Sequence, residues 1–357
     1  MTQTGRQRDS GLELLRIVAM YLIVAHHLVV NSGLAGCLDW SGGSFRTVWF
    51  ALLGMWGRIS INVFLLITGY FMCTSRLTPR RFLKLFFEIE FYSVIMWIVM
   101  CVLGYEPFTL SAATGAVFWF LVHANRYFCE GFIWFYVLIP FYNILLSGMT
   151  RRQHMILLIV LFAFFSGCST FFGNSLVYHQ AAWFVVMYMM GAWIRLYPSA
   201  WMGDNRTCVP VLLLSVAALM FYIAVFAFNM DGPPSVKMNL YFLVSPESKL
   251  PPVVIAVLSF LVFRNMKLRY SKAINAVAST TFGVLLIHGA NEGTRTWLWQ
   301  TVFNVPSLAD SPILSAVAKS IVAPFAVHAV CAVLDGLRIV VLERPLFTVF
   351  ERKGLLK

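Results

Sequence analysis

Charged residues are scarce in this chain of 357 residues: 12% are charged, whereas 60% are hydrophobic. A water-soluble domain of this size cannot bury so much apolar surface, so the composition excludes that class and indicates a polytopic membrane protein. Acidic residues are the scarcest charged type, 15 against 27 Lys and Arg. The basic residues lie in short segments between apolar runs, so membrane topology explains the net charge of +12 and we expect no nucleic-acid partner.

Cysteine is sparse as well, and its positions follow no pattern. The seven cysteines form no CxxC motif and no metal-ligand spacing, so we expect no metal site. Most lie inside apolar runs, as small buried or lipid-facing residues do. Cys37 and Cys129 lie nearer the ends of such runs, which makes them the candidates for a disulfide.

Long apolar runs recur along the whole chain, and no stretch between them is long enough for a soluble catalytic domain. A run of about twenty apolar residues predicts a membrane-crossing helix, which satisfies its backbone hydrogen bonds internally. We therefore expect an all-α, polytopic bundle of ten spans, forming a single domain over residues 1–357. The expected spans are residues 12–31, 57–74, 83–105, 131–148, 154–173, 178–196, 209–228, 250–265, 279–299 and 317–343.

Basic residues alternate between the two sides of this predicted bundle. Eighteen Lys and Arg lie in one set of loops and chain ends, and seven lie in the opposite set. Because cytoplasmic loops carry the excess of positive charge, we expect both termini of a multi-pass cell-membrane protein in the cytoplasm. The first apolar run is long and lacks a small-residue cleavage site, so we expect it to remain as the first span.

The first predicted span contains an arginine and a histidine eleven residues apart. Apart from Tyr21, everything between Arg16 and His26 is apolar, and ionisable groups in such a segment usually face a cavity or a partner. Eleven residues is close to three helical turns, so Arg16 and His27 lie on nearly the same face, about 16 Å apart along the axis. This spacing indicates a polar cleft within the bundle.

The residue types in this span suggest catalytic roles. A neutral imidazole takes a proton from a hydroxyl in the middle of the pH range, so we predict His27 as a general base. His26 is rotated by about 100° from that face and is expected to be supporting or structural. Arg16 alone is typical of an interfacial arginine that sets topology. Glu13, one turn earlier, is placed to hold the Arg16 guanidinium by an ion pair.

Two further groups of residues are ambiguous between packing and binding. Polar or small residues in the second span, among them Asn62, either let a neighbouring helix approach or contact a ligand. The basic residues that follow, Arg80 and Arg81 among them, either mark topology and contact anionic lipids or bind the phosphates of a soluble donor.

Aromatic and histidine side chains near the outer ends of later spans are equally ambiguous. Trp134 and Tyr136 are typical of an aromatic belt at the membrane surface. His288 is a second histidine inside a span, and such a residue is more often satisfied structurally than catalytic. His328, in the last span, has the same interpretation.

Five motifs in order resemble the integral-membrane acyltransferase-3 family over residues 11–347. The chain has threonine where the family usually has serine, at position 68, and leucine where an aromatic is common, at position 285. The motifs are Arg16-x10-His27, Phe64-x3-Thr68-Gly69-Tyr70, Trp134-Phe135-Tyr136, Ser279 to His288 and Glu343-Arg344-Pro345.

The resemblance implies about ten helices around a polar cavity and transfer of an acyl group, with acetyl expected, from acyl-coenzyme A to a cell-surface glycan or its lipid-linked precursor. Acyl-coenzyme A would be a substrate, with no bound cofactor, and membrane lipid would surround the chain. His27, Arg16 and Glu13 are then the catalytic candidates. The donor- or substrate-binding candidates are Arg80, Arg81, Asn62, Tyr70, Trp134, Tyr136 and His288. A transporter or flippase of a lipid-linked sugar is the alternative, because intramembrane charges are natural there too, and a membrane sensor is a third reading.

Overall fold

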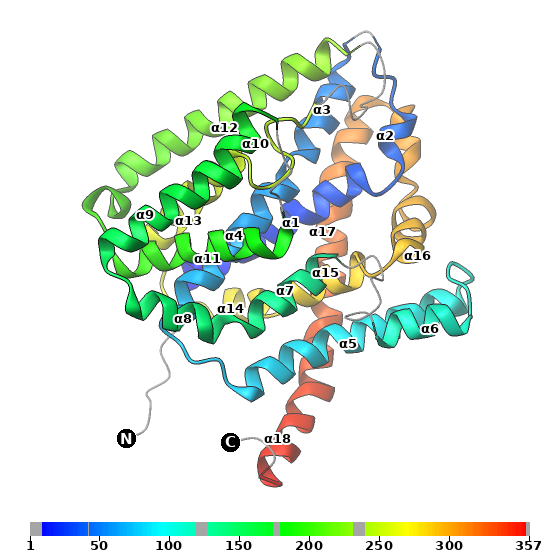
Figure 1. Ribbon diagram of the computed structural model, residues 1–357. Coiled ribbons are helices and arrows are strands. Elements are labelled where there is room, and N and C mark those ends of the chain that lie inside the picture. The colour runs from blue at the N-terminus through cyan, green and yellow to red at the C-terminus, as the bar shows by residue number, and fades with distance from the viewer. Residues whose placement is uncertain (1–8, 42, 119–126, 174–178, 231–239, 355–357) are drawn as a thin grey trace.

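The computed structural model describes residues 9–41, 43–118, 127–173, 179–230 and 240–354. Within these residues the regular elements are all helices, which confirms the all-α prediction (Figure 1). In the part of the chain that the structure describes, six helices or continuous runs of helices are long and apolar enough to cross a membrane. They are Ser10–Val30, Phe45–Met72, Pro79–Val102, Arg151–Phe171, Asn205–Phe228 and Ile313–Arg352.

Two sharply bent helix pairs raise the number of candidate spans to eight in the described part of the chain. Helices α7 (Tyr127–Val137) and α8 (Ile139–Gly148) meet at 51°, and the helices on either side of residues 289–291 meet at 100°. The two remaining predicted spans coincide with α11 (Gln180–Leu196) and α13 (Leu250–Asn265), of 17 and 16 residues. Every predicted span therefore overlaps a helix, while the number ten stays a prediction.

Helix α4 (Trp56–Met72) packs against α1 (Ser10–Val30), α11 and α13. Its contact with α11 depends on two glycines. A Cβ atom at Gly69 would lie 2.4 Å from the Tyr188 carbonyl oxygen, and one at Gly191 would lie 2.5 Å from the Leu66 carbonyl oxygen. Larger residues would therefore separate the two backbones, as is usual where membrane helices approach closely.

The chain breaks sharply after α15 (Thr281–His288), and this break shapes the interior of the bundle. Asn291 begins the next helix, α16 (Glu292–Arg295), where its side chain accepts a hydrogen bond of 2.7 Å from the Thr294 amide. The helical direction changes by 100° between the segments. His288 and Arg295 consequently lie at the ends of two short helices that point different ways.

A buried cluster of charges joins α5 (Pro79–Val102) to α17 (Ile313–Arg338) and the π-helical turn that follows it, Ile339–Glu343. The guanidinium of Arg338 contacts Asp335 at 2.7 Å, Glu343 at 3.0 Å and Glu88 at 3.2 Å. Lys84 contacts Glu343 at 2.7 Å, and the Tyr92 hydroxyl donates to Asp335 at 2.9 Å. This cluster was not predictable from the sequence, because its members belong to distant spans.

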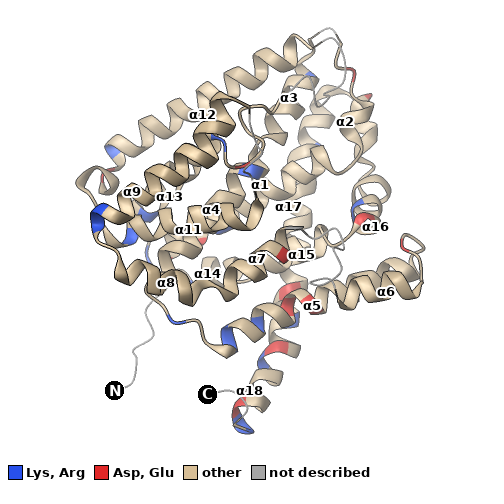
Figure 2. Ribbon diagram, viewed as in Figure 1, with Lys and Arg blue, Asp and Glu red and all other residues tan. Residues whose placement is uncertain are grey.

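Lys and Arg residues cluster on one flank of the bundle, around the start of α9 (Arg151–Phe162), the end of α11, the start of α5 and along α18 (Arg344–Arg352) (Figure 2). The C-terminal end of α1, which points away from this flank, leads to α2 (Leu34–Cys37). The uneven distribution of basic residues is the reason for expecting both termini in the cytoplasm. That placement of the termini stays a prediction.

The candidate disulfide between Cys37 and Cys129 is not formed. None of the seven cysteines, all of which lie within the described residues, belongs to a disulfide. Cys37 ends α2 and is exposed, whereas Cys129 lies on α7, is buried and lines an internal cavity. Position near the end of an apolar run did not reveal these different environments.

Candidate active site

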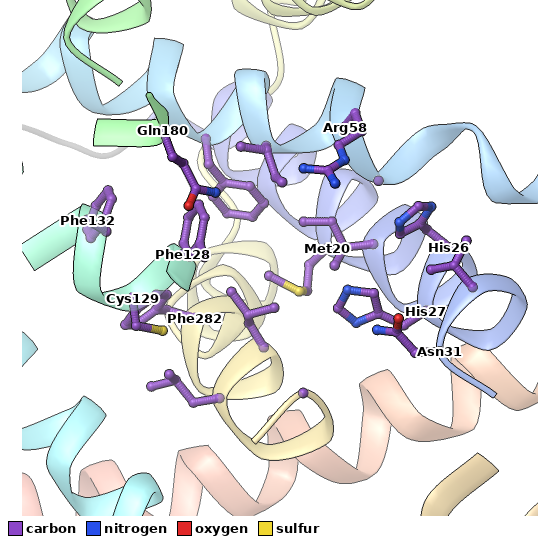
Figure 3. Close-up of a pocket in the computed structure, with 18 of the residues that line it drawn as sticks. Met20, His26, His27, Asn31, Arg58, Phe128, Cys129, Phe132, Gln180 and Phe282 are labelled. Carbon is purple, nitrogen blue, oxygen red and sulfur yellow. The ribbon is translucent and has the colours of Figure 1, made fainter. Parts of the chain in front are cut away.

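A cavity of about 620 Å³ lies between α1, α4, α7, α15 and α16 (Figure 3). One wall is apolar and aromatic, with Phe128, Phe132 and Phe282. No Asp or Glu is found among its described lining residues. The polar lining consists of His26, His27, Asn31, Arg58, Thr68, Gln180, Tyr241, Ser245 and Arg295.

Two histidines from distant parts of the chain form a hydrogen-bonded chain beside this cavity. His288 Nδ1 lies 2.6 Å from the Val284 carbonyl oxygen, and His288 Nε2 lies 2.9 Å from His27 Nδ1. A carbonyl oxygen only accepts hydrogen bonds, so His288 Nδ1 carries the proton and its neutral Nε2 is an acceptor. His27 Nδ1–H therefore donates, which leaves the lone pair on His27 Nε2. Because His27 lines the cavity, Nε2 is its basic atom available to a ligand.

His26 has a separate anchor. Its Nδ1–H donates to the carbonyl oxygen of Gly54, the last residue of α3 (Phe45–Gly54). The ring lies against Gly57, where a Cβ atom would be 2.4 Å from His26 Cδ2. The expected supporting role of His26 fits these contacts, although its ring also lines the cavity.

The predicted ion pair of the first span is present: Arg16 Nη1 lies 3.8 Å from Glu13 Oε2. However, neither residue is among those lining the cavity. The inner end of the cavity reaches Met20, one helical turn or about 6 Å along α1 from Arg16. The structure thus places Arg16 just beyond the cavity and does not bring it to His27.

Two other arginines lie at the cavity beside His27. Arg58, at the start of α4, forms an ion pair of 2.8 Å with the buried Glu247. Arg295 ends α16, and both guanidinium groups lie near enough for their charges to act on His27. In the sequence, both arginines were interpreted only as charges that set the membrane topology. Their positions inside predicted spans were the signal that could have identified them.

Asn62 and Tyr70 do not line the cavity. The Asn62 amide donates to the Glu247 carbonyl oxygen at 2.8 Å and accepts from Trp183 Nε1 at 2.9 Å. The Tyr70 hydroxyl accepts a hydrogen bond of 3.0 Å from Arg195 Nη1. Both side chains therefore contact other parts of the bundle, and Thr68 is the residue of this motif that reaches the cavity.

The aromatic and basic candidates also lie away from the cavity. Trp134 is 52% exposed on α7, as expected for an aromatic residue facing lipid, and Tyr136 stacks on Phe132. Arg80 forms an exposed ion pair of 2.8 Å with Glu351 of α18, and Arg81 Nη1 donates to the Arg76 carbonyl oxygen at 2.9 Å. Of the predicted binding residues, only His288 is brought to His27.

A comparison with known families adds independent information. A family model described as an acyltransferase domain matches residues 9–334, a range that contains every cavity-lining residue. No curated protein and no solved structure matches the chain.

Proposed function

Because this chain belongs to the acyltransferase-3 family, we propose that it transfers an acyl group, with acetyl expected, from a coenzyme A thioester to a hydroxyl of a cell-surface polysaccharide or its lipid-linked precursor. The family makes the chain an acyltransferase, and its apolar helices make it a multi-pass membrane protein. Donor, acceptor and residue roles are the proposal. The observation that carries it is the basic Nε2 of His27 at the wall of a 620 Å³ cavity.

His27 supplies general-base catalysis. Its Nε2 takes the proton of the acceptor hydroxyl while the hydroxyl oxygen attacks the thioester carbonyl carbon. The tetrahedral intermediate then breaks its C–S bond, and the leaving thiolate takes the proton back from His27. The products are an ester and the coenzyme A thiol.

His288 positions His27. Its Nε2 accepts from His27 Nδ1–H at 2.9 Å, while its own Nδ1–H is bonded to the Val284 carbonyl oxygen. These two bonds select the His27 tautomer whose lone pair is on Nε2 and hold the ring against rotation. A general base needs this orientation before it can contact the hydroxyl.

Arg16 has a place on the donor side of the cavity. It lies about one helical turn from Met20 at the inner end and is held by Glu13. The pantetheine arm of coenzyme A separates its phosphates from its thioester. Phosphates bound near Arg16 would therefore leave the acyl group free to extend toward His27, about 16 Å further along the helix.

The test uses membranes containing the protein, labelled acetyl-coenzyme A and surface glycan from the producing cells. We expect label in the glycan, and a loss of about 10²–10⁴-fold on His27→Ala at unchanged abundance. His179→Ala is the matched control, since His179 is exposed and outside the cavity lining. Less than tenfold loss on His27→Ala would remove His27 as the base. Glycan without label from the wild-type protein would refute the proposed acceptor class, and movement of a lipid-linked sugar without acylation would favour a flippase.

A further inference from the structure

We infer that the outer part of the cavity is an anion-binding subsite, formed by Arg58 and Arg295, for an acidic group on the acceptor. This inference rests on the proposed function and names its acceptor as a glycan bearing a carboxylate or a phosphate. The reacting hydroxyl would then be close to a negative charge.

The formally charged residues among the described lining of the cavity are all positive. Arg58 and Arg295 line it, and its described lining contains no carboxylate. Cations inside a membrane protein are costly and mark substrate pathways. They attract anions more strongly inside a bundle than at an exposed surface, because neither water nor salt screens them as well.

Each of the two guanidinium groups keeps N–H donors that have no partner among the described residues of the protein. The Arg58 guanidinium has one hydrogen bond, from Nη1 to Glu247 at 2.8 Å, and its other N–H groups have no partner among the described residues. The Arg295 guanidinium forms no hydrogen bond or ion pair within the described part of the chain, although Arg295 is partly buried. A guanidinium has five donors in a planar fork that matches the oxygens of carboxylates and phosphates.

The subsite lies on the acceptor side of the base. Arg58 begins α4 at the end of the cavity where α1 finishes, and Figure 3 shows it on the same side of the cavity as His26 and His27. The proposed donor phosphates lie at the other end, near Arg16. A coenzyme A molecule bound in this way does not contact Arg58 and Arg295, so these two arginines are available to bind the acceptor.

Binding can be measured without turnover on the purified full-length protein. The probes are glucuronate, glucose 6-phosphate and neutral glucose, each titrated while the melting temperature is followed. Free coenzyme A, which has no acyl group to transfer, is present at saturation. We expect a saturable rise with one or both anions and none with glucose. A response to glucuronate alone indicates an acidic sugar, and a response to the phosphate alone indicates a phosphate-bearing precursor.

The variants identify the residues. Arg295→Gln should raise the apparent Kd for the anion at least tenfold, and Arg295→Lys should restore part of the binding. Lys319→Gln is the matched control, because it removes an exposed positive charge outside the cavity and should change nothing. His27→Ala should bind the anion normally, so anion binding and the failure of acyl transfer remain distinguishable.

Four results would overturn the inference. The first two are equal responses to glucose and the anions, and no response to any of them. The others are anion binding that survives Arg295→Gln, and competition between the anions and acetyl-coenzyme A. The last result would place the donor phosphates at the outer pair instead.

Discussion

The Nδ1 atom of His27 lies 2.9 Å from the Nε2 atom of His288, although 261 residues separate the two in sequence. The pair resembles the part of a catalytic triad in which a third group orients the base. Here that group is a neutral imidazole held by the Val284 carbonyl oxygen, where a triad has a carboxylate. The bend that ends α15 at His288 gives this residue its place beside α1.

Replacing His288 should reduce turnover by loss of orientation. In His288→Ala the His27 ring loses its acceptor, so both tautomers and several ring orientations become populated. We expect kcat to fall by about 10²-fold, a cost typical of misplacing a catalytic group by an ångström, with little change in KM. His288→Gln should recover part of kcat, because its amide oxygen can accept from Nδ1–H. An unchanged kcat in His288→Ala would show that His27 needs no partner.

Replacing Gly57 should displace His26. The added Cβ of Gly57→Ala would lie 2.4 Å from the His26 ring, so the ring must move and its bond to Gly54 must weaken. Since His26 lines the cavity, we expect at least a tenfold loss of acyl transfer in a protein that is still inserted and abundant. Gly36→Ala is the control, because nothing lies within 4 Å of its Cβ. Equal activity of the two variants would contradict the arrangement of His26.

Local features of the first span were predictable from sequence. Asp9 caps α1, and Glu13 and Arg16 are three residues apart, so helical geometry alone brings them together. The contact between His27 and His288 was not predictable in this way, because it depends on how α15 packs against α1. Each histidine was identified as a candidate, but the sequence held no measure of their separation.

The second motif shows why a motif position does not define a binding residue. Ile61, Phe64 and Thr68 line the cavity at spacings that place them on one face of α4. Tyr70 follows Thr68 by two residues, which rotates it by about 200° away from that face. The sequence does not tell which helix packs against each face of α4. It therefore could not show which face of α4 lines the cavity.

The buried cluster around Arg338 should be important for stability. Arg338→Met would leave Glu88, Asp335 and Glu343 with Lys84 as the one cation that contacts the cluster within the described residues. Removing one partner from a buried ionic cluster typically costs about 3–5 kcal/mol, so we expect a much lower melting temperature and reduced abundance in membranes. Arg344→Met changes an exposed arginine six residues further along and should have little effect. Similar melting temperatures for the two variants would show that the cluster is dispensable.

Cys37 offers a direct test of orientation. It is exposed at the end of α2, whereas the other six cysteines are buried or partly buried. If both termini are cytoplasmic, α2 follows the outer end of α1, so a membrane-impermeant maleimide added to intact cells should label the protein. Cys37→Ser should abolish that labelling. Labelling that requires broken cells would reverse the orientation and exchange the donor and acceptor sides proposed above.

Arg81 is the better candidate of the two basic residues for steering the donor from the cytoplasm. Arg80 is already paired with Glu351 at 2.8 Å, whereas the Arg81 guanidinium has, among the described residues, a single hydrogen bond, to a carbonyl oxygen. Arg81→Gln should therefore raise the apparent KM for acyl-coenzyme A several-fold and more than Arg80→Gln does, with acceptor KM unchanged. High salt should mimic the change, because exposed charges are screened within about 10 Å at 0.1 M salt. Arg152→Gln removes an exposed charge from the same predicted side and should leave both constants unchanged. Equal constants for all three variants, with no response to salt, would limit this cluster to topology and leave Arg16 to bind the donor phosphates.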